Sequence, residues 1–203
     1  MNAAMIPAKA SVLKISPAKP PSEDASAAVV WLPAERLGQF SVDGALRPWL
    51  IGKGLLTQRL KAVCGERFVF RLVEQSTGLL SPELRRSLGS ADNAALFRDV
   101  EMRCGERVWV YAQTVLPDST LGAHPWLAEL GDSALGETLK DLSGLERSPY
   151  EYAWLPAAEP LCARACLHAG VNPAGLWARR SRFTLRAAPM LVQELFLPSL
   201  GSV

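Results

Sequence analysis

The sequence predicts an α+β fold, in which helices pack on an antiparallel β-sheet within a single domain. Three observations support this fold class. Segments with the alternating pattern of strands outnumber helical ones, short turns join several of them, and no helix stands between successive strands as a crossover. Parallel strands need such crossovers, so the short turns favour antiparallel pairing. A chain of 203 residues has room for one proper core.

The folded domain is expected to begin at Val29. Residues 1–28 are rich in Ala, Lys, Pro and Ser and contain no aromatic residue, a composition that predicts a flexible tail. From residue 29 to residue 203 the composition is that of a globular protein throughout. We therefore expect two parts, a tail of residues 1–28 and a domain of residues 29–203.

The first elements of the domain are marked by glycines and by a helix cap. Residues 47–63 read as a helix that is interrupted near Gly52 and Gly54. Residues 67–75 alternate as a strand does. The sequence Ser81-Pro82-Glu83 then combines an N-cap, a first-turn proline and an early acid, which predicts the start of a short helix.

Two hairpins dominate the rest of the chain. Strands at 95–104 and 107–117 flank the turn sequence Cys104-Gly105-Glu106-Arg107. The last two strands, near 178–186 and 189–197, are joined by a tight turn at Ala187-Ala188. Between the hairpins we expect helices near 124–130 and 133–142, a strand at 149–155 and a helix at 159–169.

Composition excludes several classes of protein. The net charge of +2 is too small to indicate nucleic-acid binding, and no run approaches the roughly 18 apolar residues of a membrane span. No zinc-like spacing occurs, so neither a metal nor an organic cofactor is expected. Reduced thiols and a cytoplasmic location are the resulting expectation. The residues considered as metal ligands are Cys64, Cys104, Cys162, Cys166, His124 and His168.

Arg98 is expected to project among apolar side chains. Residues two apart in a strand share a face of the sheet, so Arg98 lies on the same face as Leu96, Val100 and Met102. A cation in such surroundings requires a partner or a ligand. The opposite face is expected to meet solvent, and its side chains are those of Phe97, Asp99, Glu101 and Arg103.

Glu194 is an anion expected in similar surroundings to those of Arg98. By the same alternation it shares a face with Met190, Val192 and Phe196, and it is the only acidic residue after Glu159. Burying a carboxylate alone is costly, so Glu194 is expected to be either paired or functional. The arginine-rich segment 177–182 nearby is expected at a sheet edge or a helix junction, with a mainly structural role.

The alternation leaves two arrangements of Arg98 and Glu194 open. In the first they pair with each other as a structural salt bridge. In the second both point into one cavity with a ligand between them. Arg98 would then bind a carboxylate, while Glu194 would accept a hydrogen bond from a hydroxyl or stay protonated.

Several segments resemble the chorismate pyruvate-lyase family. The sequence GLWARRSRFTL at 175–185, followed by PMLVQELFLP at 189–198, is similar to the C-terminal hairpin of that family. The segments LLTQRL at 55–60, LFRDVEMRC with WVYAQTVLP at 96–117, and Ala-Leu-Gly at 134–136 agree in order and spacing. The resemblance spans residues 50–198. Departures are Gln113, where the best-known member has an arginine, and an insertion at about 156–173.

This resemblance implies an internal ligand cavity that lies under helical flaps. Arg98 falls where the family binds an aromatic carboxylate, and Glu194 falls where it meets the para-hydroxyl. Leu56 and Leu135 fall where backbone N–H groups assist the carboxylate. Arg98 and Glu194 are therefore the implied catalytic residues as well as binding residues.

The resemblance also implies a function. It is that of a cofactor-independent lyase, which converts chorismate into 4-hydroxybenzoate and pyruvate and supplies the ubiquinone ring. The expected partners are chorismate and its product, without nucleic acid or a membrane span, and the expected state is a monomer. One alternative is a non-catalytic module that binds aromatic acids, because effector domains of some bacterial transcription regulators share this architecture. Another is an aromatic-acid carrier that has lost its chemistry.

Overall fold

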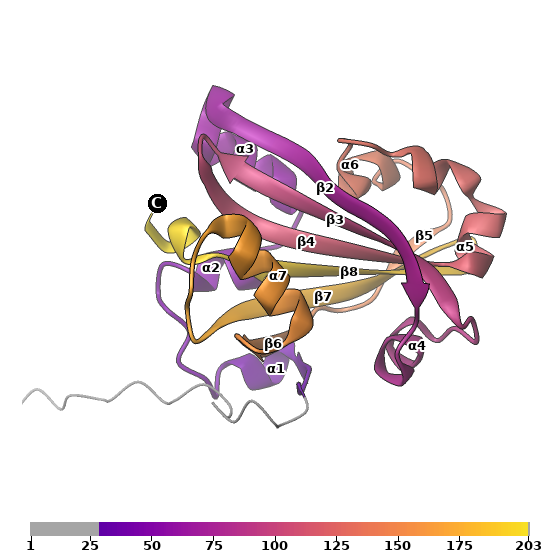
Figure 1. Cartoon of the computed structure of the whole chain (residues 1–203), viewed down its shortest axis with the longest axis horizontal. Helices are drawn as coiled ribbons and strands as arrows, with labels where there is room; N and C mark the ends of the chain where they lie inside the picture. The colour runs from indigo at the N-terminus through magenta and orange to yellow at the C-terminus, as the bar shows by residue number, and fades with distance from the viewer. Residues whose placement is uncertain (1–28, 203) are drawn as a thin grey trace, which may run out of the picture.

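The computed structural model describes residues 29–202, which form one antiparallel sheet with helices around it (Figure 1). The order of the strands is β1-β6-β7-β8-β4-β3-β2, and β5 pairs with β7 beside this path. All described strand pairs are antiparallel. The predicted α+β class is therefore confirmed. The tail predicted for residues 1–28 lies outside the described residues.

The strands alternate with short helices along the chain. The strands are β1 (Leu32–Pro33), β2 (Phe68–Leu79), β3 (Ala94–Cys104), β4 (Arg107–Pro117), β5 (Leu145–Arg147), β6 (Glu151–Pro156), β7 (Gly175–Leu185) and β8 (Ala188–Phe196). The α-helices are α1 (Ala34–Leu37), α2 (Arg47–Ile51), α3 (Leu56–Cys64), α4 (Pro82–Leu88), α5 (Asp118–Ala123), α6 (Leu135–Leu139) and α7 (Pro160–Ala169). Short 3-10 helices occupy Gly65–Arg67, Pro125–Glu129 and Pro198–Ser202.

Both predicted hairpins are present, and the second one turns one residue earlier than expected. Its two central residues are Arg186 and Ala187, which both have positive φ angles, and Leu185 pairs with Ala188. Positive φ at both central positions is the geometry of the tight turns that match the twist of paired strands. The expected turn at Ala187-Ala188 is therefore wrong by one residue, because Ala188 already belongs to β8.

Local signals placed most of the helices correctly. The helical segment breaks between α2 and α3 as Gly52 and Gly54 predict, and Ser81 caps α4 by accepting a hydrogen bond from the N–H of Leu84 at 3.1 Å. The helix expected near 124–130 is a 3-10 helix, Pro125–Glu129, and α5 before it was not predicted. A residue before proline avoids the helical region, and His124 (φ −138°, ψ 69°) precedes Pro125. The short elements β1, α1 and β5 were not predicted.

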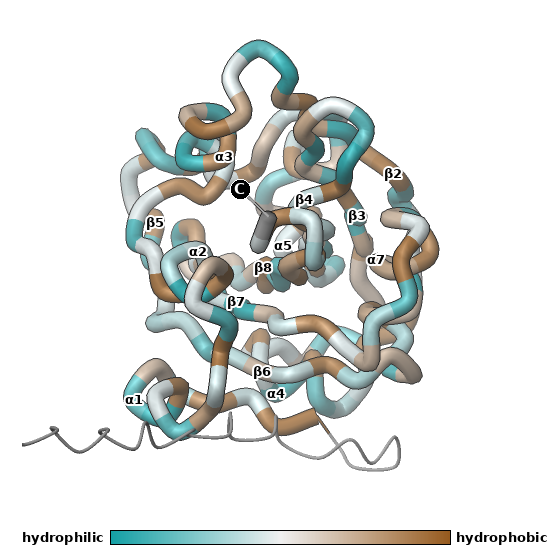
Figure 2. The backbone as a smooth tube through the Cα atoms, turned by 90° about the vertical axis from the view of Figure 1, so that its left-hand side faces the viewer, coloured by the Kyte–Doolittle hydropathy of each residue, from teal (hydrophilic) through white to brown (hydrophobic). Residues whose placement is uncertain are grey.

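Helices cover both faces of the sheet. Figure 2 looks along the sheet and shows α7 on one side of β4 and β8, with α2 and α3 on the other side. The α2–α3 side forms a core with Leu50, Leu60 and Val110, and the α7 side forms a second core with Leu161 and Ala165.

The face expected to meet solvent is therefore covered. Asp99 and Glu101 retain only 4% and 2% of their exposed area, because α7 lies over them. Arg164 of α7 pairs with Asp99, and His168 lies 3.5 Å from Glu101. Asp99 is thus paired with a helix residue 65 positions further along the chain, while Glu101 is paired with Arg103 of its own strand at 2.9 Å.

Two of the four cysteines form a disulfide, which corrects the expectation of reduced thiols. Cys64 ends α3 and Cys104 ends β3, and their Cα atoms lie 5.7 Å apart. Cys162 and Cys166 are free and buried within α7. The disulfide fixes the C-terminal end of α3 to the same strand that carries Arg98.

Candidate functional site

A small cavity lies inside the molecule, on the α2–α3 side of the sheet. Its volume is about 60 Å³, and Arg98, Glu194, Leu56 and Leu135 all line it. The structure thus brings together every site residue that the sequence predicted. Typical small-molecule sites measure about 300–1,000 Å³. The segments that enclose the cavity from α3 and α6 are therefore expected to move when a ligand enters.

Arg98 projects into this cavity from β3 and is almost completely buried, with 1% of its area exposed. Its Nη2 donates to the carbonyl oxygens of Gly131 and Ser133, at 2.5 and 2.8 Å. Its Nε is buried without a hydrogen-bond partner. Burial lowers the pKa of Arg98, and the charge of Asp132 opposes this effect. An unpartnered buried N–H of a guanidinium is a donor that suits an anionic ligand.

Glu194 reaches the cavity from β8 and is paired with Arg179 rather than with Arg98. The two residues stand directly opposite each other on β8 and β7, and Arg179 Nε donates to Glu194 Oε2 at 2.5 Å. No described residue donates to Oε1 of Glu194, which leaves this oxygen available to a ligand hydroxyl. The possible salt bridge between Arg98 and Glu194 is therefore not the arrangement found.

Arg179 supports Glu194 from inside the sheet and is fully buried, at 0% exposure. Desolvation by burial is the largest single effect on the pKa of Arg179 and lowers it, but the charge of Glu194, its hydrogen bond and the neighbouring Tyr150 together outweigh this, so the pKa of Arg179 is raised. Its Nη1 also donates to the carbonyl oxygens that end α2, those of Trp49, Leu50 and Gly52. The expectation of a sheet edge for segment 177–182 is wrong, because β7 lies between β6 and β8.

Leu56 and Leu135 are the first residues of α3 and α6. N–H groups in the first turn of a helix have no partner within that helix, so their main chains can donate to a ligand. The two helix starts lie against each other, because a Cβ added at Gly136 would stand 3.2 Å from the side chain of Leu55. A salt bridge of 3.0 Å between Lys61 and Glu137 joins the two helices on their outer side.

Arg147 and Tyr150 also line the cavity, and the sequence did not indicate them. The Tyr150 hydroxyl is buried without a partner, and burial raises the pKa of Tyr150. The strand that carries Arg147, β5, has three residues, which is too short to give a periodic signal. These two residues are recognisable only from their place in the folded chain.

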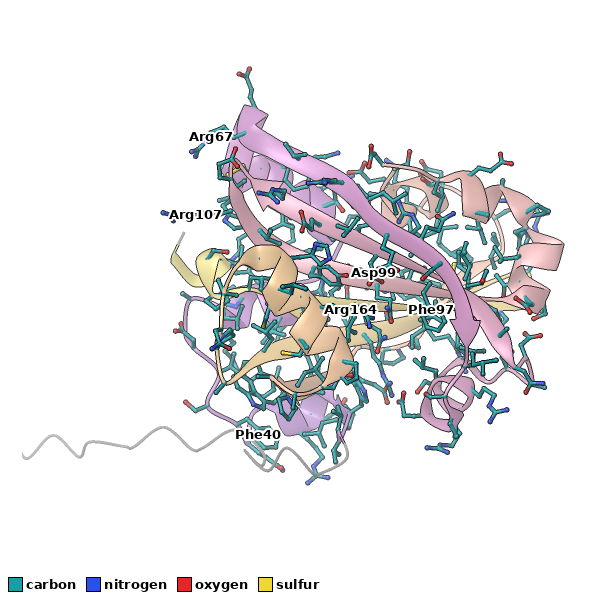
Figure 3. All side chains as sticks on the ribbon, in the orientation of Figure 1. Phe40, Arg67, Phe97, Asp99, Arg107 and Arg164 are labelled. Atoms are coloured by element: carbon teal, nitrogen blue, oxygen red, sulfur yellow. A yellow bond between two sulfur atoms is a disulfide. The ribbon has the colours of Figure 1, made fainter. Side chains whose placement is uncertain are left out.

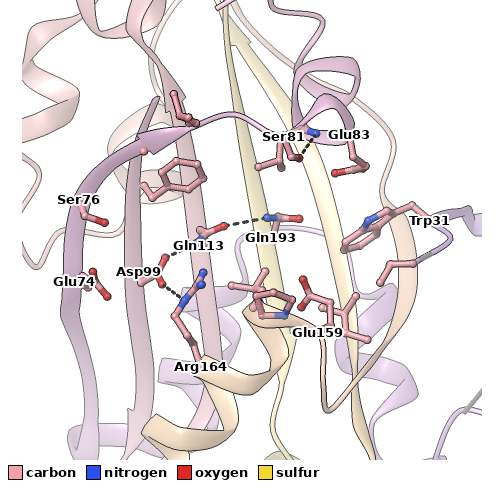
Figure 4. Close-up of a pocket in the computed structure, with 18 of the residues that line it drawn as sticks. Trp31, Glu74, Ser76, Ser81, Glu83, Asp99, Gln113, Glu159, Arg164 and Gln193 are labelled. Atoms are coloured by element: carbon pink, nitrogen blue, oxygen red, sulfur yellow. Dashed lines mark hydrogen bonds and ion pairs between the residues drawn. The ribbon is translucent and has the colours of Figure 1, made fainter. Parts of the chain in front are cut away.

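A larger cavity of about 740 Å³ lies on the α7 side of the sheet. Figure 3 shows Asp99 and Arg164 side by side there, and Figure 4 shows the chain of contacts that continues through Gln113 to Gln193. Asp99 also accepts a hydrogen bond from the Tyr111 hydroxyl at 2.6 Å. The buried groups of this cavity thus satisfy one another. Gln113 belongs to this face and does not line the smaller cavity.

Unsatisfied groups distinguish the smaller cavity from the larger one. Within residues 29–202, the buried side-chain atoms without a hydrogen-bond partner are Arg98 Nε, Tyr150 Oη and Arg179 Nη2. Two of these residues line the smaller cavity, and Arg179 holds Glu194 in place there. Buried polar atoms without partners are rare and call for an explanation, and a bound ligand is one. The smaller cavity is therefore the candidate functional site.

The arrangement fits a particular shape of ligand. One part of the cavity offers Arg98 and the helix-start N–H groups to an anion, while Glu194 offers a carboxylate oxygen to a hydroxyl. The walls between them are mostly apolar and include Val100, Met102 and Val192. In the described part of the chain, no three His, Cys, Asp or Glu side chains gather as metal ligands. None of its helices is long and apolar enough to cross a membrane.

Comparison with known proteins identifies the relatives of this chain. The chorismate lyase family matches residues 25–202. A protein of Nitrosospira multiformis named "probable chorismate pyruvate-lyase" is 38% identical over 84% of this chain and 93% of its own length. A protein of the same name from Methylococcus capsulatus is 40% identical over 78% of this chain and 98% of its own length.

Solved structures share the fold at low sequence identity. The effector domain of PhnF from Mycobacterium smegmatis has a TM-score of 0.53 and 17% identity, and covers 73% of this chain and 91% of that domain. The C-terminal domain of the histidine utilization repressor from Pseudomonas syringae has a TM-score of 0.53 and 10% identity, and covers 66% of this chain and 93% of that domain. At these identities the likeness concerns the fold alone.

Proposed function

This chain belongs to the chorismate lyase family, and from that premise we propose how its own residues carry out the family's reaction. It is an enzyme, a lyase that cleaves chorismate to 4-hydroxybenzoate and pyruvate. The observation that carries the proposal is the meeting of Arg98 and Glu194 in one cavity, each with an atom that no described residue satisfies. The fold shared with effector domains does not favour a non-catalytic binding module over an enzyme.

We assign the ring carboxylate of chorismate to Arg98. Its Nε is buried without a partner, and Gly131 and Ser133 hold the guanidinium in place through Nη2. The N–H groups of Leu56 and Leu135 complete the contacts of the carboxylate. Both side chains are apolar, which fits a role that uses only the main chain. A charged donor in a shielded site gives a stronger hydrogen bond than a neutral one does.

We assign the ring hydroxyl to Glu194. Arg179 occupies Oε2, so Oε1 accepts the hydrogen bond of the hydroxyl that becomes the phenol of 4-hydroxybenzoate. Glu194 therefore acts first in positioning the ring, and it is also the nearest candidate for moving a proton during the elimination.

The reaction requires mainly that the enzyme orient chorismate correctly. Loss of pyruvate makes the ring aromatic, so the products are strongly favoured once the ether bond breaks. The enzyme contributes by fixing the ring between Arg98 and Glu194 and by stabilising charge as it develops on the leaving group. The apolar walls of the cavity exclude water, which strengthens both effects.

Finer features of the function are also proposals. We propose that the product supplies ubiquinone synthesis, that the enzyme acts in the cytoplasm as a monomer, and that residues 29–203 are its catalytic domain. The family resemblance supports these assignments. Disulfides are rare in reducing compartments, so the redox state of Cys64 and Cys104 in cells tests the assignment of the compartment directly.

One experiment tests the central proposal. The purified chain is incubated with chorismate, and 4-hydroxybenzoate and pyruvate are measured over time. We expect the two products in equal amounts, and we expect a Glu194→Gln, Arg98→Ala double variant to form neither above the rate of spontaneous decay. Binding of 4-hydroxybenzoate without turnover of chorismate would instead indicate a carrier or an effector module.

A further inference from the structure

Chorismate carries two carboxylates, whereas Arg98 accounts for only one of them. The charged residues that line the cavity are Arg98, Glu194 and Arg147. Glu194 forms an ion pair with Arg179, which itself does not line the cavity. Among the described residues, neither Arg98 nor Arg147 forms an ion pair with a carboxylate. The cavity thus presents two cations without counter-ions to a ligand that carries two negative charges.

Arg147 is held in a way that leaves its outer nitrogens free. Its Nε donates to the hydroxyl of Ser181 at 3.0 Å. Its guanidinium carbon lies 4.1 Å from the ring centroid of Tyr150 and 4.8 Å from that of Phe183. Stacking on aromatic rings fixes the plane of a guanidinium without using its N–H groups. No described carboxylate pairs with Nη1 or Nη2 of Arg147.

Tyr150 links Arg147 to the Glu194 end of the cavity. The same ring that stacks on Arg147 lies 4.3 Å from the guanidinium carbon of Arg179, which holds Glu194. The Tyr150 hydroxyl is buried and has no partner. Arg147 and Tyr150 therefore lie near the group that binds the ring hydroxyl. In chorismate the enolpyruvyl ether is attached to the ring carbon next to the one that bears this hydroxyl.

We propose that Arg147 and the Tyr150 hydroxyl form the subsite for the carboxylate of the enolpyruvyl side chain. This assignment rests on the proposed function and adds a second anion contact, supplied from β5 and from the residue that precedes β6. Arg147 is exposed, so the pyruvate formed in this subsite lies next to solvent. The product 4-hydroxybenzoate lacks the side chain and does not use the subsite. Arg147 and Tyr150 thus distinguish substrate from product.

The test compares the substrate with the product in the same variants. Arg147→Met should lower kcat/KM for chorismate by about ten- to a hundredfold, because it removes a charged contact that is partly open to water. The Kd of 4-hydroxybenzoate, measured by calorimetry, should stay within twofold of the wild-type value. Arg147→Lys should restore part of the loss, since an ammonium keeps the charge but not the planar fork. Tyr150→Phe should lower kcat/KM about threefold or more, again with little change in product affinity.

Controls separate this proposal from the proposed function. Arg107→Gln removes an exposed arginine at the far end of the sheet (Figure 3) and should leave both kcat/KM and product affinity unchanged. A wild-type chain that does not turn over chorismate would refute the proposed function itself. With an active wild type, an Arg147→Met variant that keeps its kcat/KM, or one that loses product affinity in parallel, would overturn the subsite.

Discussion

Arg179 and Glu194 stand directly opposite each other on β7 and β8, and Arg179 Nε donates to Glu194 Oε2 at 2.5 Å. Glu194 is therefore paired with Arg179 and not with Arg98. Arg98 consequently keeps its charge without an ion-pair partner among the described residues. Arg179 thus stabilises the protein, whereas Arg98 is available to bind the ligand.

Substitution of Arg98 should affect catalysis more than folding. Truncating one partner of a shielded, charged contact typically costs about 2–5 kcal/mol, so Arg98→Ala should lower kcat/KM by about two orders of magnitude or more. Arg98→Lys should restore only part of the lost kcat/KM, because an ammonium cannot donate the paired hydrogen bonds of a planar guanidinium. Kinetics and melting temperature are measured together. A large fall in Tm with near-normal activity at low temperature would show that Arg98 is structural.

The product should bind more tightly than benzoate does, because Glu194 accepts a hydrogen bond from the para-hydroxyl. A hydrogen bond to a charged group contributes about 1.5–3 kcal/mol, which corresponds to about a tenfold or greater difference in Kd. Glu194→Gln should remove most of this difference while the affinity for benzoate changes little. Calorimetry with both acids measures the effect. Equal affinities of the wild-type protein for the two acids would exclude the contact.

Loss of Arg179 should destabilise the fold strongly. Arg179→Met leaves Glu194 as a buried charge without its partner, a change that typically costs about 3–5 kcal/mol. The neighbouring Arg180 pairs with Glu83 and Glu151, whose side chains are partly exposed and can be solvated when the arginine is removed. Arg180→Met should therefore cost less. Unfolding in urea gives both free energies, and equal losses would contradict the importance of the Arg179–Glu194 pair.

Reduction of the disulfide should lower stability and loosen α3. The bond between Cys64 and Cys104 closes a loop across 40 residues, for which chain entropy predicts about 4 kcal/mol. Dithiothreitol should therefore lower the Tm of the wild-type protein. A Cys64→Ser, Cys104→Ser variant should have this low Tm from the start and should not respond to reductant. A Cys162→Ala, Cys166→Ala variant, which keeps the disulfide, should still respond.

Cys162 should react slowly with thiol reagents near neutral pH. Burial raises the pKa of the Cys162 thiol to about 12, from an ordinary value near 9. The folded state therefore holds this proton more tightly than the unfolded state does. The resulting stability is fully present below about pH 9 and is lost as the pH rises towards 12. Labelling with iodoacetamide and unfolding at several pH values test both statements, and rapid labelling of the folded protein at pH 7 would contradict them.

The sequence determined the local features of this protein. Alternation placed Arg98 and Glu194 on the inward faces of their strands, glycines separated α2 from α3, and Ser81 capped α4. Each of these depends on residues close in the chain, where periodicity and turn chemistry act directly. The predicted hairpins for β3–β4 and β7–β8 belong to the same group.

Tertiary structure alone decided the partners of these residues. A turn at Ala187-Ala188 would place Phe196 opposite Arg179, whereas the turn found at Arg186-Ala187 places Glu194 there. A shift of one residue in a turn thus changes every cross-strand pair, because register is set by the turn geometry and by burial on each face. The helix over Asp99, the disulfide of Cys64 and the place of Tyr150 in the cavity depend on contacts between distant segments. Local patterns carry no information about such contacts, since these form only when the whole chain packs.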